Sequence, residues 1–100
     1  MVKKQVIWPS IAKNDLLSIL DYYYKRNGNK VYSGKLYKKF QKNVSLISKI
    51  SFLGKPTDIP HVRIITINEY LLFYKVSAKE IIILTIWDSR RNPDNLNINS

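Results

Sequence analysis

The sequence has 100 residues, no cysteine and a formal net charge of +10 at pH 7. This length suits one domain, and the absence of cysteine excludes a disulfide framework, a thiolate metal site and a cysteine nucleophile. The start of the chain has no signal-type apolar core and no apolar stretch is long enough to span a membrane, so we expect a cytoplasmic protein without membrane contact.

The positive charge is concentrated in the N-terminal half. Residues 1–57 contain 12 lysines or arginines against two acids, Asp15 and Asp21, whereas residues 58–100 balance five bases with five acids. Such an excess favours a polyanionic partner, either a nucleic acid or an acidic protein. It is equally compatible with a solvated surface that keeps the protein soluble.

The N-terminal half predicts a strand followed by a helix. Residues 3–8 alternate weakly and end at Pro9, which suits a first strand. A helix should follow, with Ser10 as its N-cap and Asp15 in an early turn, where negative charge is favourable, and it should end at the left-handed exit signal Asn27-Gly28. Its apolar residues fall on one face at helical spacing: Ala12, Leu16, Ile19, Leu20 and Tyr23.

A second helix is predicted over residues 30–51. Its apolar face comprises Leu36, Phe40, Val44, Ile47 and Ile50. The opposite face carries a basic stripe: Lys35, Lys38, Lys42 and Lys49. This stripe is either a solvated face or a docking surface for nucleic acid or an acidic protein.

The C-terminal part predicts a loop at residues 54–60 and then three strands, Val62–Ile67, Tyr70–Val76 and residues 81–87, joined by short polar turns. On the middle strand the side chains alternate, with Tyr70, Leu72, Tyr74 and Val76 on one face and Leu71, Phe73 and Lys75 on the other. One face should pack on the helices. The second face is also apolar, which points to a protein partner.

In this order and spacing the segments resemble the RelE/ParE superfamily of bacterial type II toxins. The resemblance rests on Trp-Pro-Ser after the first strand, the helical hairpin, a Gly-Lys-Pro-Thr loop, Val-Arg-Ile at 62–64, Tyr-Leu-Leu-Phe-Tyr at 70–74 and Ile-Trp-Asp-Ser-Arg-Arg-Asn-Pro at 86–93. It implies an α+β fold of β-α-α-β-β-β order, in which a helical hairpin packs on a small, mainly antiparallel sheet. It covers nearly the whole chain and implies one toxin domain over residues 1–96. The Asn-rich end of the chain lacks a periodic pattern, so we expect a mobile polar tail at 97–100.

The resemblance further implies a cognate antitoxin, encoded next to the toxin, that blocks it through the exposed sheet face and the region of Arg63, Arg90 and Arg91. Operator DNA would be contacted only through the complex with the antitoxin. ParE-like members are associated with poisoning DNA gyrase by binding, and the Tyr-Leu-Leu-Phe-Tyr strand with the arginine pair before Asn-Pro favours this branch.

The target stays open at this point, and with it the question of whether the chain is an enzyme. RelE-like members cut messenger RNA on the ribosome, and the candidate catalytic residues would then be Arg63, Tyr70, Lys75 and Arg90. This chain departs from that branch at Leu71, where many members have an arginine, and has no tyrosine or histidine after Arg91. A third possibility is a degenerate module that only binds its antitoxin and helps to repress their shared operon.

The candidates for binding the target or the antitoxin are Arg63, Tyr74, Arg90 and Arg91. Each has a structural alternative: Arg63 is equally explained by an ion pair with Asp58 or Asp88, and Tyr74 by packing in the core. The only histidine, His61, has no cysteine, second histidine or clustered carboxylate as a partner, so we expect no metal and no cofactor.

Overall fold

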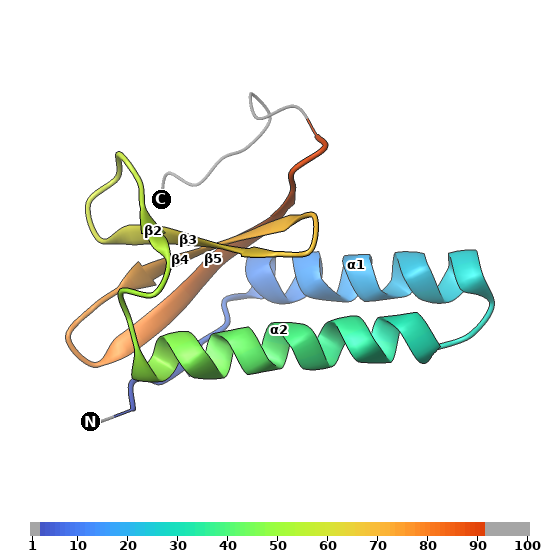
Figure 1. Ribbon diagram of the computed structural model, residues 1–100, viewed down its shortest axis with the longest axis horizontal. Helices are drawn as coiled ribbons and strands as arrows, with labels where there is room; N and C mark the ends of the chain where they lie inside the picture. Colours follow the sequence, from blue (N-terminus) through green and yellow to red (C-terminus); the bar gives the residue numbers. More distant parts are fainter. Residues whose placement is uncertain (1–2, 92–100) are drawn as a thin grey trace.

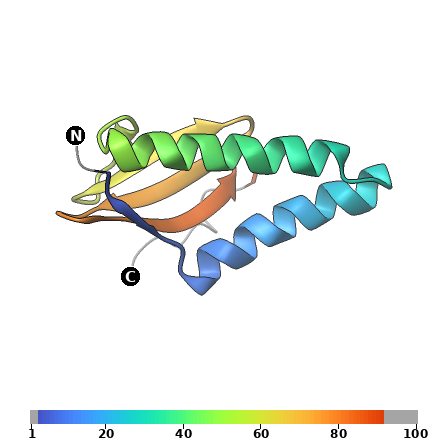
Figure 2. The same ribbon diagram turned by 90° about the horizontal axis from the view of Figure 1, so that it is seen from below.

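The computed structural model describes residues 3–91 of the protein. Two helices, α1 (Ser10–Asn27) and α2 (Val31–Lys49), lie side by side on one face of a single sheet (Figures 1 and 2). The strands are β1 (Gln5–Ile7), β2 (Lys55–Pro56), β3 (Val62–Ile67), β4 (Tyr70–Val76) and β5 (Glu80–Asp88). The predicted α+β fold of β-α-α-β-β-β order is confirmed, with one addition, because β2 lies inside the segment predicted as a loop.

The strand order in the sheet is β1-β5-β4-β3-β2. β1 pairs with β5 in parallel and all other neighbours are antiparallel. β5 carries one extra residue opposite the Phe73–Tyr74 step of β4, which is a β-bulge. Because β1 covers only residues 80–82 of β5, the later half of β5 is an edge, and α1 packs against this strand.

The two faces of the sheet carry separate apolar clusters. The main core lies between the sheet and the helices and contains Tyr70, Leu72, Tyr74 and Val76 of β4. The outer face carries a smaller cluster of Val62, Phe73 and Trp87, against which Ile59, Ile64, Leu71 and Leu84 pack half-buried. The alternation predicted for β4 is therefore confirmed, and the apolar second face exists.

The helix boundaries differ slightly from the prediction. α1 begins at Ser10 itself, so the predicted Ser10 cap was wrong by one residue: the extended backbone of Pro9 (φ −61°, ψ 162°) provides the cap position and no side chain caps the helix. Gly28 ends α1 with a φ of 72°, which confirms the left-handed exit. α2 ends at Lys49, so the predicted helix end at residue 51 and the place of Ile50 on the apolar face were wrong. Ile50 is the C-cap residue and is 49% exposed.

Within the described residues, no helix combines the length and apolar character that crossing a membrane requires. The predicted domain limit at residue 96 and the predicted tail at 97–100 lie outside the described residues.

Candidate binding site at the arginine pair

The arginine pair follows β5 directly, in a turn that Asp88 holds. Asp88 Oδ1 accepts hydrogen bonds from the backbone N–H and from Nε of Arg90, both at 2.9 Å, and Oδ2 accepts one from Nη2 at 2.8 Å. These hydrogen bonds lower the pKa of the Asp88 carboxyl, and the carboxylate in turn raises the pKa of the Arg90 guanidinium. The Arg90 side chain is 59% exposed, yet its direction is fixed by this two-pronged pairing.

Arg91 is held by an aromatic ring instead of a carboxylate. Its guanidinium carbon lies 4.9 Å from the ring centroid of Trp87, which belongs to the apolar cluster on the outer face of the sheet. The Arg91 backbone N–H donates to the Asp88 carbonyl oxygen at 2.9 Å, so the same turn positions both arginines. A guanidinium group over an indole face keeps its charge available to a further anion.

Both arginines line a hollow of about 460 Å³ between α1 and the ends of β4 and β5. We call this hollow and its two guanidinium groups the arginine site. Its other lining residues are Asp15, Ser18, Ile19 and Tyr22 from α1 and Tyr70, Ile86 and Asp88 from the strands. Guanidinium groups beside hydroxyl groups can bind a carboxylate or a phosphate.

One acid in the arginine site is already engaged with the sheet. Asp15 Oδ2 accepts hydrogen bonds from Thr85 Oγ1 at 2.7 Å and from the backbone N–H of Ile86 at 3.3 Å. The backbone N–H of Ile86 lies on the part of β5 that β1 does not cover, so Asp15 satisfies a donor at the sheet edge. The carboxylate therefore attaches α1 to β5, the two elements between which the hollow lies.

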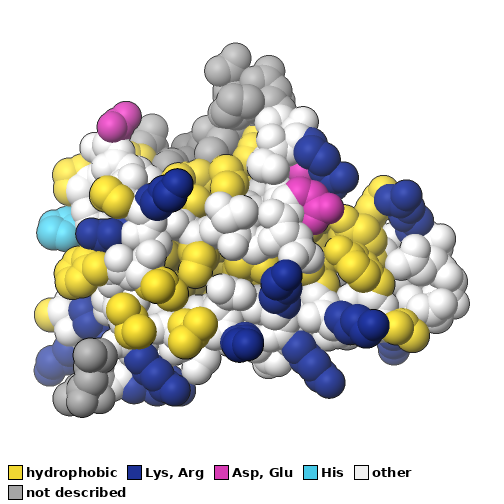
Figure 3. Space-filling model, viewed as in Figure 1, with side chains coloured by type: hydrophobic (Ala, Val, Ile, Leu, Met, Phe, Trp, Pro, Cys, Tyr) yellow, Lys and Arg dark blue, Asp and Glu magenta, His cyan; other side chains and the backbone are white. Residues whose placement is uncertain are grey.

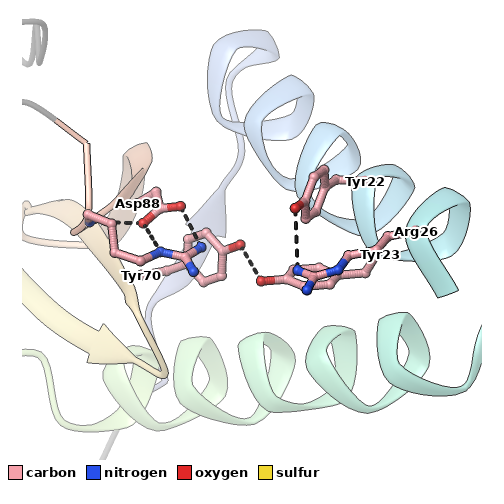
Figure 4. Close-up of polar contacts among 6 residues, drawn as sticks. Tyr22, Tyr23, Arg26, Tyr70 and Asp88 are labelled. Carbon is pink, nitrogen blue, oxygen red and sulfur yellow. Dashed lines mark hydrogen bonds and ion pairs between the residues drawn. The ribbon is translucent and has the colours of Figure 1, made fainter.

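Two buried tyrosines, Tyr70 and Tyr23, lie beside the arginine site with their hydroxyl groups in contact (Figure 4). Tyr70 Oη and Tyr23 Oη are 3.1 Å apart, and both side chains are buried. Burial, and then the hydrogen bond to Tyr23, raise the pKa of the Tyr70 hydroxyl above its usual value of about 10. Tyr70 therefore remains protonated at neutral pH and is not suited to act as a general base.

Arg63 and Tyr74 lie away from the arginine site, where they hold the loop that connects α2 to β2. Tyr74 is 0% exposed; its hydroxyl accepts a hydrogen bond from the Gly54 N–H at 2.8 Å and donates one to the Ser51 carbonyl at 2.9 Å. Arg63 Nη1 donates to the carbonyl oxygens of Gly54 at 2.6 Å and Phe52 at 3.3 Å. We call these four contacts the loop clamp. Neither predicted ion pair of Arg63, with Asp58 or with Asp88, is present among the described residues.

The four residues of the RNA-cleavage hypothesis do not form one constellation. Arg63 is opposite Tyr74 on the helix-facing side of the sheet, whereas Lys75 is exposed on the outer side, the side that also carries Phe73. Tyr70 lies at the other end of β4, roughly 17 Å from Lys75 at a rise of about 3.4 Å per residue. Arg90 is near Tyr70 in the arginine site. The four side chains are thus divided between two ends and two faces of the sheet.

The remaining candidates lie on the surface. Lys35, Lys38, Lys42 and Lys49 are all exposed along α2. His61 is exposed and has a left-handed backbone, with a φ of 67°. Within residues 3–91, no group of three or more histidine and acidic side chains is placed to hold a metal ion.

Comparisons with known proteins identify the family. A family model described as the ParE toxin of type II toxin–antitoxin system, parDE, matches residues 6–93. The chain belongs to the ParE toxin family. The solved structure of a chromosomal ParDE TA system from P. aeruginosa is similar to it, with a TM-score of 0.73 and 26% sequence identity over 84% of this chain and 94% of that chain. No curated protein matches the chain at a significant level.

ParE membership confirms the resemblance to the RelE/ParE superfamily and the preference for its ParE-like branch, and it implies a cognate antitoxin as a partner. The sequence drew attention to Arg90, Arg91 and Tyr70 but did not place Asp88, Asp15 and Tyr22 beside them. Asp88, two residues before Arg90, is a typical Asx-turn signal that was available in the sequence. Asp15 and Tyr22 gave no such signal, because only the packing of α1 against β5 brings them there.

Proposed function

We propose that this ParE toxin inhibits growth by binding DNA gyrase through the arginine site, with Arg90 and Arg91 as the principal contacts. The observation that carries the proposal is that both guanidinium groups are exposed and fixed in direction by Asp88 and Trp87. Pre-oriented groups lose little conformational freedom when a partner binds, and arginine is the residue most suited to a forked contact with a carboxylate. Binding needs no general acid or base, which agrees with the separation of Arg63, Tyr70 and Lys75.

The test uses purified, antitoxin-free toxin in a gyrase supercoiling assay on relaxed plasmid, with ribosome-bound messenger RNA cleavage measured in parallel. We expect lost supercoiling or trapped cleaved DNA, and intact messenger RNA. The double change Arg90→Ala, Arg91→Ala should abolish the inhibition. The matched control, Lys75→Ala with Lys79→Ala, removes the same charge from exposed positions and should retain it. Cut messenger RNA with normal supercoiling would establish the RelE-like alternative instead.

The second part of the proposal is that the cognate antitoxin neutralises the toxin by binding an apolar groove along the helix pair. A hollow of about 500 Å³ lies against β1 and both helices and is lined by Trp8, Leu16, Leu17, Tyr37 and Phe40, among others. A second hollow of about 350 Å³ continues it, because Leu17 and Tyr37 line both. Leu17 is 62% exposed and Tyr37 41%, whereas Phe73 and Trp87 on the outer face of the sheet are buried.

We call these two hollows the helix groove and assign to it an antitoxin segment with apolar anchors and flanking acidic residues. Lys3 and Lys13 line the groove and supply the complementary charge. Leu17→Glu should lower the affinity for the cognate antitoxin without changing gyrase inhibition. Ile11→Glu is the control, because Ile11 is 70% exposed on the same helix and lines neither hollow. If Leu84→Glu on the outer sheet face lowers the affinity instead, the antitoxin uses the sheet, as the sequence led us to expect.

A further inference from the structure

The outer side of α2 carries four lysines on one side of the helix that none of the surfaces described above uses. At about 100° per residue, Lys35, Lys38, Lys42 and Lys49 fall within an arc of roughly 60° on the helix. The buried residues Leu36, Phe40, Val44 and Ile47 lie on the opposite side. We call the four exposed lysines the lysine face. Figure 3 shows lysine and arginine side chains gathered along the lower margin of the molecule, where Figure 1 places α2.

This charge has no acidic counterpart in the adjoining sequence. The sequence contains no aspartate or glutamate between Asp21 and Asp58, while nine lysines or arginines lie in that interval. Among the described residues the ion pairs are Lys25 with Asp21 and Arg90 with Asp88, so none involves the lysine face. Lysines spaced three and four residues apart on a helix repel one another by a few tenths of a kcal/mol per pair. The arrangement thus concentrates charge at a small cost in stability, unlike a solvated face with interspersed signs.

The composition of the lysine face distinguishes among polyanionic partners. Protein interfaces are depleted in lysine and depend on aromatic and arginine anchors, and no such residue lies among these four positions. Single-stranded nucleic acids are bound by stacking on aromatic side chains, which this arc of α2 also lacks. Lysine ammonium groups act as point charges toward phosphate. Four of them on a rigid helix suit contacts with a regular phosphate backbone, which do not depend on the base sequence.

We propose that the lysine face docks ParE onto the phosphate backbone of duplex DNA, independently of the antitoxin and without sequence specificity. From Lys35 to Lys49 the helix advances about 21 Å, which corresponds to roughly six base pairs of B-form DNA. The lysine face and the arginine site lie on different elements, so DNA and a protein target can be held at the same time. This contact needs no gyrase, so it can be tested apart from the proposed function.

The experiment measures the binding of antitoxin-free toxin to a labelled duplex of about 20 base pairs by fluorescence anisotropy, between about 50 and 200 mM NaCl. Two variants with equal charge loss are compared. One replaces the lysine face, Lys35→Gln, Lys38→Gln, Lys42→Gln and Lys49→Gln; the other replaces four exposed lysines elsewhere, Lys3→Gln, Lys55→Gln, Lys75→Gln and Lys79→Gln. Circular dichroism confirms that both variants are folded.

If the lysine face contacts four phosphates, its replacement should reduce the slope of log Kobs against log salt concentration by about 3.6, at 0.9 per phosphate. The control variant should change the slope by less than about 1. Equal changes in the two variants would overturn the proposal, because net charge alone would then explain binding. It would also be overturned if wild-type toxin failed to bind the duplex at the lowest salt concentration, or if it bound polyglutamate more tightly than DNA.

Discussion

Removal of one hydroxyl group, by the substitution Tyr74→Phe, tests the loop clamp. The phenylalanine ring fills the same space except for the hydroxyl oxygen, so the main effect of the change is the loss of two hydrogen bonds. Those bonds satisfy the Gly54 N–H and the Ser51 carbonyl, at a position where the tyrosine itself is 0% exposed. The variant leaves both backbone groups without their partner in a buried environment.

The expected loss of unfolding free energy follows from these two groups. Each intramolecular hydrogen bond contributes about 1 kcal/mol net, and a buried donor or acceptor left unsatisfied costs about 1–3 kcal/mol. Some relaxation of the loop is to be expected, so we predict a loss of about 2–4 kcal/mol, a large part of the stability of about 5–15 kcal/mol that is typical of a domain. Urea unfolding monitored by circular dichroism measures this difference.

The control is Tyr37→Phe, because Tyr37 is 41% exposed and takes part in none of the side-chain hydrogen bonds found among the described residues. Its effect should lie within about 0.5 kcal/mol. If Tyr74→Phe also cost less than about 0.5 kcal/mol, the reasoning would be refuted, since the Tyr74 hydroxyl would then not be the group that holds the loop. Hydrogen exchange gives an independent check: the Gly54 amide should be protected in the wild type and lose that protection in the variant.

Three further substitutions test other parts of the fold. Gly54→Ala should destabilise the protein by about 1–3 kcal/mol, because the new Cβ would lie 2.6 Å from Tyr74 Oη and 2.7 Å from a backbone carbonyl oxygen. In Gly34→Ala the new Cβ meets nothing within 4 Å, so this change should stabilise α2 by up to about 1 kcal/mol. Thermal unfolding of the two variants compares these effects. The raised pKa of Tyr70 stabilises the folded state fully below the unfolded pKa of about 10, and this contribution is lost as the pH rises from there through the folded pKa. Urea unfolding at pH values from about 9 to 12 should show a smaller loss of stability for Tyr70→Phe than for the wild type, and equal losses would contradict the assignment.

The sequence predicted the main elements well because burial determines their periodicity. The three-four spacing of α1 and α2 and the alternation along β4 correspond to the faces that the core covers. The errors lie where periodicity carries no information. β2 has only two residues, one of them Pro56 at the sheet edge, so no alternating pattern announced it. Ile50 followed the apolar pattern of α2, but the helix ends before it.

The functional residues were harder to predict, because the role of a side chain depends on its partners and many of those partners are distant in sequence. Arg63 reads as a cation available to a ligand, yet alternation along β3 places it on the helix-facing side with Ile65 and Ile67. There it reaches the carbonyl oxygens of Phe52 and Gly54, which no sequence pattern reveals. The Asp88–Arg90 pair, in contrast, spans two residues and is the kind of contact that sequence can predict.

The separation of charges in this ParE toxin has a physical origin in its topology. Arg63 lies within the sheet and its Nη1 donates to two backbone carbonyl oxygens, whereas the arginines beyond the last strand are exposed. The four lysines of the lysine face are exposed on α2, because the opposite side of that helix packs in the core. Since the lysine face and the arginine site share no hydrogen bond or ion pair within residues 3–91, their substitutions should act additively. Loss of the lysine face should then raise the toxin concentration needed to inhibit DNA-bound gyrase, and loss of Arg90 and Arg91 should abolish inhibition at any concentration while leaving the salt dependence of DNA binding unchanged.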